Sequence, residues 1–171
     1  MRAAIAPAVV VLGLGNLLLS DEGVGVRALE RLQTDPRLPA GLTLIDGGTL
    51  GLELLSCAAG ATHLLVLDAV DVAVAPGTIV RLTGEALAHL PGGASVHQLG
   101  VADLLAALRL MGQEPAELVL LGVQPAVLTL GAALSPPVAA ALAPLVEAAL
   151  TELTRWGQTA PPMEERCTKR A

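Results

Sequence analysis

Three short, uninterrupted runs of aliphatic residues constrain the fold of this chain more than any other feature. They cover residues 8–14, 64–67 and 118–123 and are rich in Val and Leu. A strand with one face in water alternates apolar and polar residues, whereas an uninterrupted run indicates a strand that is buried on both faces. Such strands are typical of parallel sheets with helices on both sides, so the runs predict an α/β protein.

The segments between these runs predict amphipathic helices and two further strands. In residues 22–33, Val24, Val26, Leu29 and Leu32 have the spacing of one helical face, and charged residues occupy the other. Thr49 is a suitable cap for the second helix, and Ser135 followed by Pro136 suits the start of the last. The further helices are expected over residues 50–59, 98–111 and 136–155, and the further strands over residues 42–45 and 78–82.

The strand over residues 78–82 is expected to run antiparallel at a sheet edge. The gap after residue 67 is too short for the crossover helix that a parallel neighbour needs. We therefore predict a single-domain three-layer sandwich: a twisted, mostly parallel five-stranded sheet with helices on both faces and one antiparallel edge strand. The domain is expected to span residues 1–156, and residues 157–171 form a polar, loosely ordered C-terminal tail.

Composition argues against several classes of function. A net charge of −6, the absence of Phe and Tyr, and a single Trp disfavour nucleic-acid binding. Cys57 and Cys167 have no CxxC spacing, so we expect neither a disulfide scaffold nor a zinc knuckle. We expect a cytoplasmic location instead. The apolar N-terminal residues 3–19 are interrupted by Gly13 and Gly15, with no cleavage site after them, so we interpret them as a strand and turn rather than a signal peptide. No membrane partner is expected.

Three residues near the predicted carboxyl ends of the strands are candidates for chemistry. Glu22 follows the loop after the first strand, Asp68 ends the third, and His97 precedes a helix. Ligands of α/β sheets bind at this edge. Two carboxylates and an imidazole suit a divalent metal such as nickel or zinc, with room for water or substrate. Each residue also has a structural interpretation, as a helix-dipole partner, a loop acceptor or a helix cap.

The turn after the first strand also permits a second hypothesis, a nucleotide- or dinucleotide-binding module. Gly13 and Gly15 begin a dinucleotide fingerprint, but Leu18 stands where the third glycine belongs. Asp46, the acidic residue after the second strand, also lies farther from the glycines than the fingerprint requires. The competing interpretation is a tight turn that allows a close approach of the backbone.

Six segments, taken together, resemble the hydrogenase maturation endopeptidases. The similarity covers residues 8–155, and the tail carries no family motif. The segments occur in the family's order: LGLGNLLLSDEGVG (12–25), DGGTLGLELL (46–55), HLLVLDAV (63–70), APGTIVRL (75–82), HQLGVADLLAALRLMG (97–112) and LVLLGVQP (118–125).

The resemblance implies a function and a set of site residues. Members of this family cleave the C-terminal extension from the large-subunit precursor of nickel–iron hydrogenase after nickel insertion. The family's metal-contacting residues correspond to Glu22, Asp68 and His97, and Asp46 corresponds to a supporting residue. The resemblance implies a cytoplasmic monomer that recognises nickel supplied by the precursor, although another divalent metal can occupy the site in vitro.

The resemblance leaves the mechanism open. A carboxylate can act as general base on water, or nickel can polarise the scissile carbonyl. The family is at times grouped with aspartic proteases, but no paired catalytic DTG-type aspartates occur here. A third hypothesis is a chaperone without catalytic activity that holds the nickel-loaded subunit through the same three residues.

Overall fold

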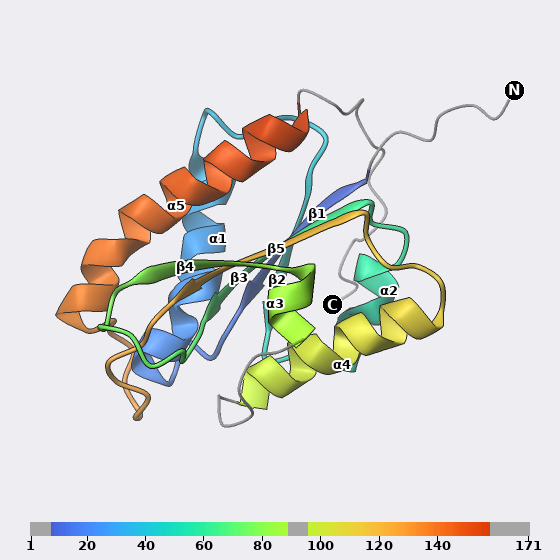
Figure 1. Ribbon diagram of the computed structural model, residues 1–171. Helices are drawn as coiled ribbons and strands as arrows, with labels where there is room; N and C mark the ends of the chain where they lie inside the picture. Colours follow the sequence, from blue (N-terminus) through green and yellow to red (C-terminus); the bar gives the residue numbers. More distant parts are fainter. Residues whose placement is uncertain (1–7, 89–95, 158–171) are drawn as a thin grey trace, which may run out of the picture.

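The three aliphatic runs form the three central strands of the sheet. The computed structural model describes residues 8–88 and 96–157. The sheet has the order β2-β1-β3-β5-β4 (Figure 1). Its strands are β1 (Val9–Leu14), β2 (Thr43–Gly48), β3 (His63–Ala69), β4 (Ile79–Thr83) and β5 (Glu117–Val123).

Strand directions confirm the predicted topology. β1 pairs in parallel with β2 and β3, and β3 pairs in parallel with β5. β4 pairs antiparallel with β5 and lies at the edge of the sheet. All four parallel strands therefore end at one edge of the sheet, which we call the carboxyl edge.

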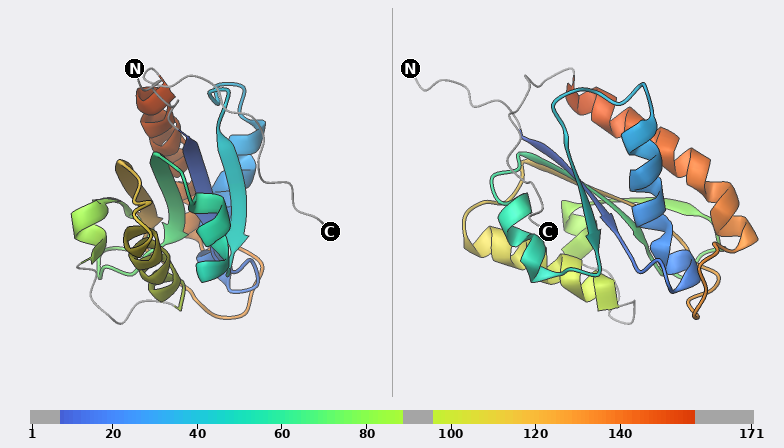
Figure 2. Two further views of the ribbon diagram at one scale, coloured as in Figure 1. Left: turned by 90° about the vertical axis from the view of Figure 1, so that its right-hand side faces the viewer. Right: turned by 180° about the vertical axis from the view of Figure 1, so that it is seen from behind.

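Helices cover both faces of the sheet and close two apolar cores (Figure 2). On one face, α1 and α5 enclose a core that includes Leu29, Leu67 and Leu145. On the other, α2 and α4 enclose a core that includes Leu12 and Leu104. The helices are α1 (Val24–Thr34), α2 (Leu55–Ala58), α3 (Gly84–Ala88), α4 (Val96–Leu110) and α5 (Pro136–Gly157), with 3-10 turns η1 (Ser20–Gly23) and η2 (Leu52–Leu54).

The last helix is long and apolar enough to cross a membrane by length and composition alone. However, α5 buries Val138, Leu145, Leu153 and Trp156 in the core that it shares with α1 and the sheet. Its apolar character is therefore accounted for by packing within the protein.

Several predicted boundaries were wrong. β2 continues to Gly48, because Gly48 pairs with Leu14 and its carbonyl accepts a hydrogen bond from Gly15. The predicted helix over residues 50–59 is reduced to η2 and the short α2, and Thr49 does not cap it, since Gly51 holds the cap position of η2. Cys57 of α2 is half-buried.

The predicted bounds of helices α1 and α5 differ only slightly from those in the structure. η1 takes Glu22 out of the predicted first helix, so that α1 begins at Val24. α5 extends to Gly157, which had been assigned to the tail. The rest of the predicted tail, residues 158–171, lies outside the described residues.

Candidate functional site

Glycines bring the turn that carries Glu22 onto the ends of the central strands. A Cβ on Gly25 would lie 2.1 Å from the carbonyl oxygen of Leu67 and 2.4 Å from that of Leu14, so the start of α1 touches the ends of β3 and β1. Gly15 has φ +126°, and a Cβ there would lie 1.7 Å from the carbonyl oxygen of Glu22. The position of Glu22 beside the carboxyl edge is therefore fixed by backbone contacts.

Asp68 lies fully buried near the end of β3. Its Oδ1 accepts a hydrogen bond of 2.8 Å from the backbone N–H of Ala69. Its Oδ2 is buried and has no hydrogen-bond partner among the described residues. Buried polar atoms are almost always paired, so this oxygen indicates a site for a proton, a metal ion or a substrate group.

Glu22 and Asp68 lie close enough to interact electrostatically. Glu22 is only 6% exposed, at a turn that contacts β3. Burial, opposed by the hydrogen bond from Ala69 and assisted by the negative charge of Glu22, raises the pKa of Asp68 from 3.8 to about 7. A carboxyl group with a pKa in this range can hold or release a proton at neutral pH.

Asp21, beside Glu22, was not predicted as a functional residue. Its Oδ2 accepts hydrogen bonds of 2.8 Å from the backbone N–H groups of Ala126 and Val127 and from the Ser135 hydroxyl. Its Oδ1 accepts the Ser135 N–H at 2.7 Å. Burial raises the pKa of Asp21, but these bonds outweigh burial and hold that pKa below its ordinary value. Asp21 thus fastens the turn that bears Glu22 to the loop after β5.

The only signal for Asp21 in the sequence is a carboxylate directly after an apolar turn. Its partners lie 105 to 114 residues away along the chain, and no local pattern connects them. The Ser135 hydroxyl, expected to cap α5, donates to Asp21 instead, while the Ser135 carbonyl accepts the hydrogen bond from Ala139 that starts the helix.

Gln124, at the end of β5, supports the neighbouring loop after β3 in a similar way. Its Oε1 accepts the backbone N–H of Val72 at 2.9 Å, and its Nε2 donates to the Asp71 carboxylate at 3.1 Å. The loop after β5 is therefore held by Asp21, and the loop after β3 by Gln124. Gln124 was also not predicted as a functional residue, because a glutamine after an aliphatic run does not indicate which distant residues it binds.

His97 approaches the carboxyl edge from the opposite face. It is the second residue of α4, as predicted for a loop-to-helix junction, and α1 and α4 begin at the same end of the sheet in both figures (Figures 1 and 2). Its side chain lies outside the described part of the chain. Among the described side chains, no three His, Cys, Asp or Glu residues form a metal-binding group. The three-residue metal site stays a prediction.

Asp46 lies in β2, beside β1, where it pairs in register with Gly13. Its side chain is exposed, and its Oδ1 accepts a hydrogen bond of 3.0 Å from the backbone N–H of Gly48. This bond stabilises the glycine-containing end of the strand. A supporting role for Asp46 in the site stays a prediction.

The glycines of the first turn are occupied by the protein itself. A Cβ on Gly13 would lie 2.7 Å from the Cβ of Leu29, and one on Gly15 would overlap the Glu22 carbonyl. Both glycines therefore admit helix α1 and its preceding turn. This packing favours the tight-turn interpretation over a phosphate-binding loop.

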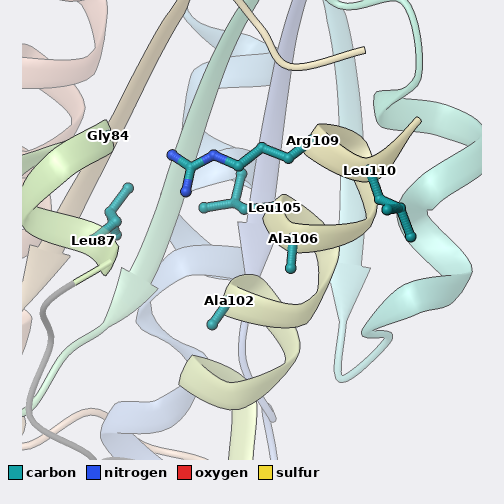
Figure 3. A pocket seen from close by; sticks show the side chains of 7 residues that line it. All are labelled: Gly84, Leu87, Ala102, Leu105, Ala106, Arg109 and Leu110. Carbon is teal, nitrogen blue, oxygen red and sulfur yellow. The ribbon is translucent and has the colours of Figure 1, made fainter. Parts of the chain in front are cut away.

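An open groove of about 540 Å³ lies between α3 and α4, away from the carboxyl edge (Figure 3). Leu87 and Leu105 line it, and Arg109 lies at one end, where it forms an ion pair of 2.7 Å with Glu114. The groove contains none of the candidate residues. We therefore do not count the groove as part of the candidate site.

Comparisons with known proteins agree with this geometry. A sequence model of the hydrogenase maturation protease family matches residues 26–152. The chain is 43% identical over 158 residues to the hydrogenase 2 maturation protease of Escherichia coli, covering 91% of this chain and 96% of that protein. It is 42% identical to a hydrogenase expression/formation protein, HupD, of Rhodobacter capsulatus, over 87% and 72% of the two chains.

Solved structures extend the similarity to three dimensions. The hydrogenase maturating endopeptidase HybD of E. coli superposes with a TM-score of 0.82 at 43% identity, covering 86% of this chain and 93% of that one. A nickel–iron hydrogenase maturation protease from Thermococcus kodakarensis superposes with a TM-score of 0.72 at 27% identity, covering 85% and 99%. Sequence and fold thus agree over nearly the whole described domain, and the chain belongs to the hydrogenase maturation protease family.

Proposed function

We propose that this protein is the endopeptidase that removes the C-terminal extension from the nickel-loaded large-subunit precursor of a nickel–iron hydrogenase, the last step of large-subunit maturation. Membership of a protease family supports this function, as do identities above 40% with one relative named as a hydrogenase maturation protease and another named as a hydrogenase expression/formation protein. We further propose that it acts in the cytoplasm as a monomer.

The observation that carries the proposal is the buried Oδ2 of Asp68, which has no hydrogen-bond partner among the described residues. This oxygen lies at the carboxyl edge, where Glu22 contributes a second carboxylate and where α4, whose second residue is His97, begins. Carboxylate and imidazole are ligands that nickel accepts. In this proposal Glu22, Asp68 and His97 contact the nickel carried by the precursor, and another divalent metal can take its place in vitro.

Recognition of the precursor would then depend on its nickel. A loaded precursor offers a metal ion that bridges the two proteins, whereas an empty one offers none, binds weakly and is not cut. Nickel bound near the scissile bond would supply Lewis acidity. We further propose that one of the two carboxylates acts as general base on the attacking water.

The direct test is an incubation of the purified protein with cognate precursor, with and without nickel, followed by intact mass measurement. Loss of a short C-terminal peptide from the nickel-loaded precursor alone is the expected result. Cleavage of both forms would contradict the nickel gate. Binding of the loaded precursor without any cleavage would replace the endopeptidase with a chaperone.

Variants of the three residues test the site independently. Glu22→Gln and His97→Ala should abolish processing, because each removes one ligand from the proposed set. Glu30→Gln, an exposed glutamate on α1, is the matched control and should process normally. Normal processing by both site variants would show that the residues are assigned wrongly.

A further inference from the structure

Large apolar side chains are exposed mainly at the carboxyl edge. Of the nine large hydrophobic residues exposed in the described part of the chain, seven lie in the segments that connect β1, β2, β3 and β5 to the next α-helix or strand. The other two, Leu110 and Met111, lie at the far end of α4. Exposed apolar surface gathered at one place on a protein marks an interaction site.

Four of the seven lie on two segments that are hydrogen-bonded to each other, and we call their exposed side chains the apolar ridge. Leu18 is 66% exposed in the turn after β1, and Val127, Leu128 and Leu130 are 39%, 44% and 85% exposed in the loop after β5. The two segments lie side by side at the lower left of Figure 1, in blue and orange. Residues 14–20 and 124–135 contain no charged residue. The cores of protein interfaces are depleted of charge in the same way.

Hydrogen bonds hold the two segments of the ridge together. The N–H of Ser20 donates to the Gly131 carbonyl at 2.7 Å, and the N–H of Gly131 donates to the Leu18 carbonyl at 2.9 Å. The Ser20 hydroxyl donates to the Thr129 carbonyl at 3.0 Å. Asp21 adds its bonds to the N–H groups of Ala126 and Val127. The backbone that carries the exposed side chains of the ridge is therefore held in place by these hydrogen bonds.

The backbone of the ridge also holds an unfavourable conformation. Ser20 has φ +51°, a left-handed value that costs non-glycine residues free energy. A Cβ on Gly131 would lie 2.6 Å from the Ser20 Oγ, so a larger residue there would displace the Ser20 hydroxyl from its place beside Gly131. Apolar exposure and backbone strain at one place both cost stability, and such costs persist where function requires them.

The ridge is continuous with the candidate active site. Leu18 and Glu22 belong to the same connection between β1 and α1, and the segment after β5 is bound to that connection through Asp21. If a protein chain is cut at Glu22 and Asp68, the surface around its scissile bond must lie on the adjoining loops. We propose that the apolar ridge is the docking surface for an uncharged, apolar region of the large-subunit precursor beside its C-terminal extension. This inference rests on the proposed function.

The test compares a ridge variant with a matched control. The double variant Leu18→Ser/Leu130→Ser removes the two most exposed ridge leucines, and Leu110→Ser removes a leucine that is 90% exposed at the far end of α4. Binding of nickel-loaded precursor is measured by interferometry, and processing by intact mass. Because these side chains are exposed, unchanged melting temperatures should confirm folding. Leu130→Ser alone serves if the double variant fails to fold.

We expect the ridge variant to bind precursor at least tenfold more weakly, since each buried leucine contributes about tenfold or more in affinity. KM should rise accordingly, whereas kcat, measured at saturating precursor, should equal that of the wild type. Leu110→Ser should match the wild type. Unchanged affinity of the ridge variant, with normal cleavage by the wild type, would overturn the ridge and leave the proposed function intact. Ridge-dependent binding without cleavage would uphold the ridge and overturn the endopeptidase.

Two other outcomes would overturn the proposed docking surface. If the wild type neither binds nor cuts the loaded precursor, both the proposed function and the docking surface are overturned. If sedimentation shows a wild-type dimer that the ridge variant converts to monomer, the occupant of the ridge is a second copy of this chain, and the proposed partner is wrong.

Discussion

At the scale of single residues, Asp68 is unfavourable for the stability of the fold and informative about its function. A carboxyl group in a fully buried position beside another carboxylate is costly to ionise, which is why its pKa rises to about 7. A hydrophobic residue would fit such a position at the end of a central strand at no such cost. The presence of a carboxyl group there is therefore explained by chemistry at the carboxyl edge rather than by packing.

This residue gives the protein a characteristic dependence of stability on pH. Between the unfolded pKa of 3.8 and the folded pKa of about 7, the folded state keeps a proton that the unfolded state has lost. The free energy of unfolding of the metal-free protein should therefore fall as pH rises through this window, at about 1.4 kcal/mol for each unit of pKa difference.

The variant Asp68→Asn tests this expectation. It is neutral at every pH and retains an oxygen for the Ala69 N–H, so its stability should match the wild type near about pH 4 and exceed it above about pH 7 by a few kcal/mol. Urea unfolding across this range measures the difference. Asp103→Asn, at an exposed position on α4, is the control. Parallel pH profiles for wild type and Asp68→Asn would refute a raised pKa.

At the scale of elements, the site depends on the contact between turn η1 and the loop after β5. Arg27 of α1 adds to this contact by donating to the Ala132 carbonyl. The Asp21 carboxylate is the centre of the contact, because it satisfies three backbone N–H groups and one hydroxyl. Any change there should be transmitted to Glu22, its neighbour in the chain.

We expect Asp21→Asn to weaken both the fold and the processing reaction. The amide group replaces one acceptor with a donor that faces other donors, and each buried donor left unsatisfied costs roughly 1–3 kcal/mol. Ser135→Ala removes only the hydroxyl bond and should cost about 1 kcal/mol. Thermal unfolding and precursor processing measure the two effects. Equal, small effects of both variants would show that the Asp21 charge is unimportant.

Helix α1 should also be sensitive at Gly25. Gly25→Ala places a methyl group about where the carbonyl oxygens of Leu67 and Leu14 lie, so α1 must move away from the sheet. Overpacking of this kind costs about 1–3 kcal/mol or more, and it should abolish processing because Glu22 moves with the helix. Gly84→Ala is the control, since no atom lies within 4 Å of its added Cβ. Circular dichroism and processing assays compare the two.

At the scale of the whole molecule, the sequence predicts what local patterns determine and misses what distant contacts determine. The buried strand β3 follows from its aliphatic run. The antiparallel direction of β4 follows from the short loop before it. Asp68 follows from its place at a strand end. The partners of Asp21 and Gln124 do not, because those bonds form between loops that only the finished sheet brings together. The extension of β2 to Gly48 was missed for the same reason, since β1 supplies its partner.

The C-terminal end of the fold gives the last prediction. Trp156 is the only tryptophan of the chain, is 1% exposed, and donates its indole N–H to Glu117 at 2.8 Å. A chain that ends after Gly157 retains Leu153 and Trp156, whereas a chain that ends after Glu152 loses both. Removing two large core side chains costs several kcal/mol, of the order of the whole stability of a domain.

We therefore expect the chain that ends after Gly157 to fold and to process precursor like the full-length protein, and the shorter chain to be unfolded. Circular dichroism reports folding for both, and Trp156 fluorescence gives the unfolding midpoint of the longer one. A large loss of stability in the longer chain would show that residues 158–171 contribute to the fold, contrary to the predicted domain boundary. Normal stability with lost processing would instead give those residues a part in binding the precursor.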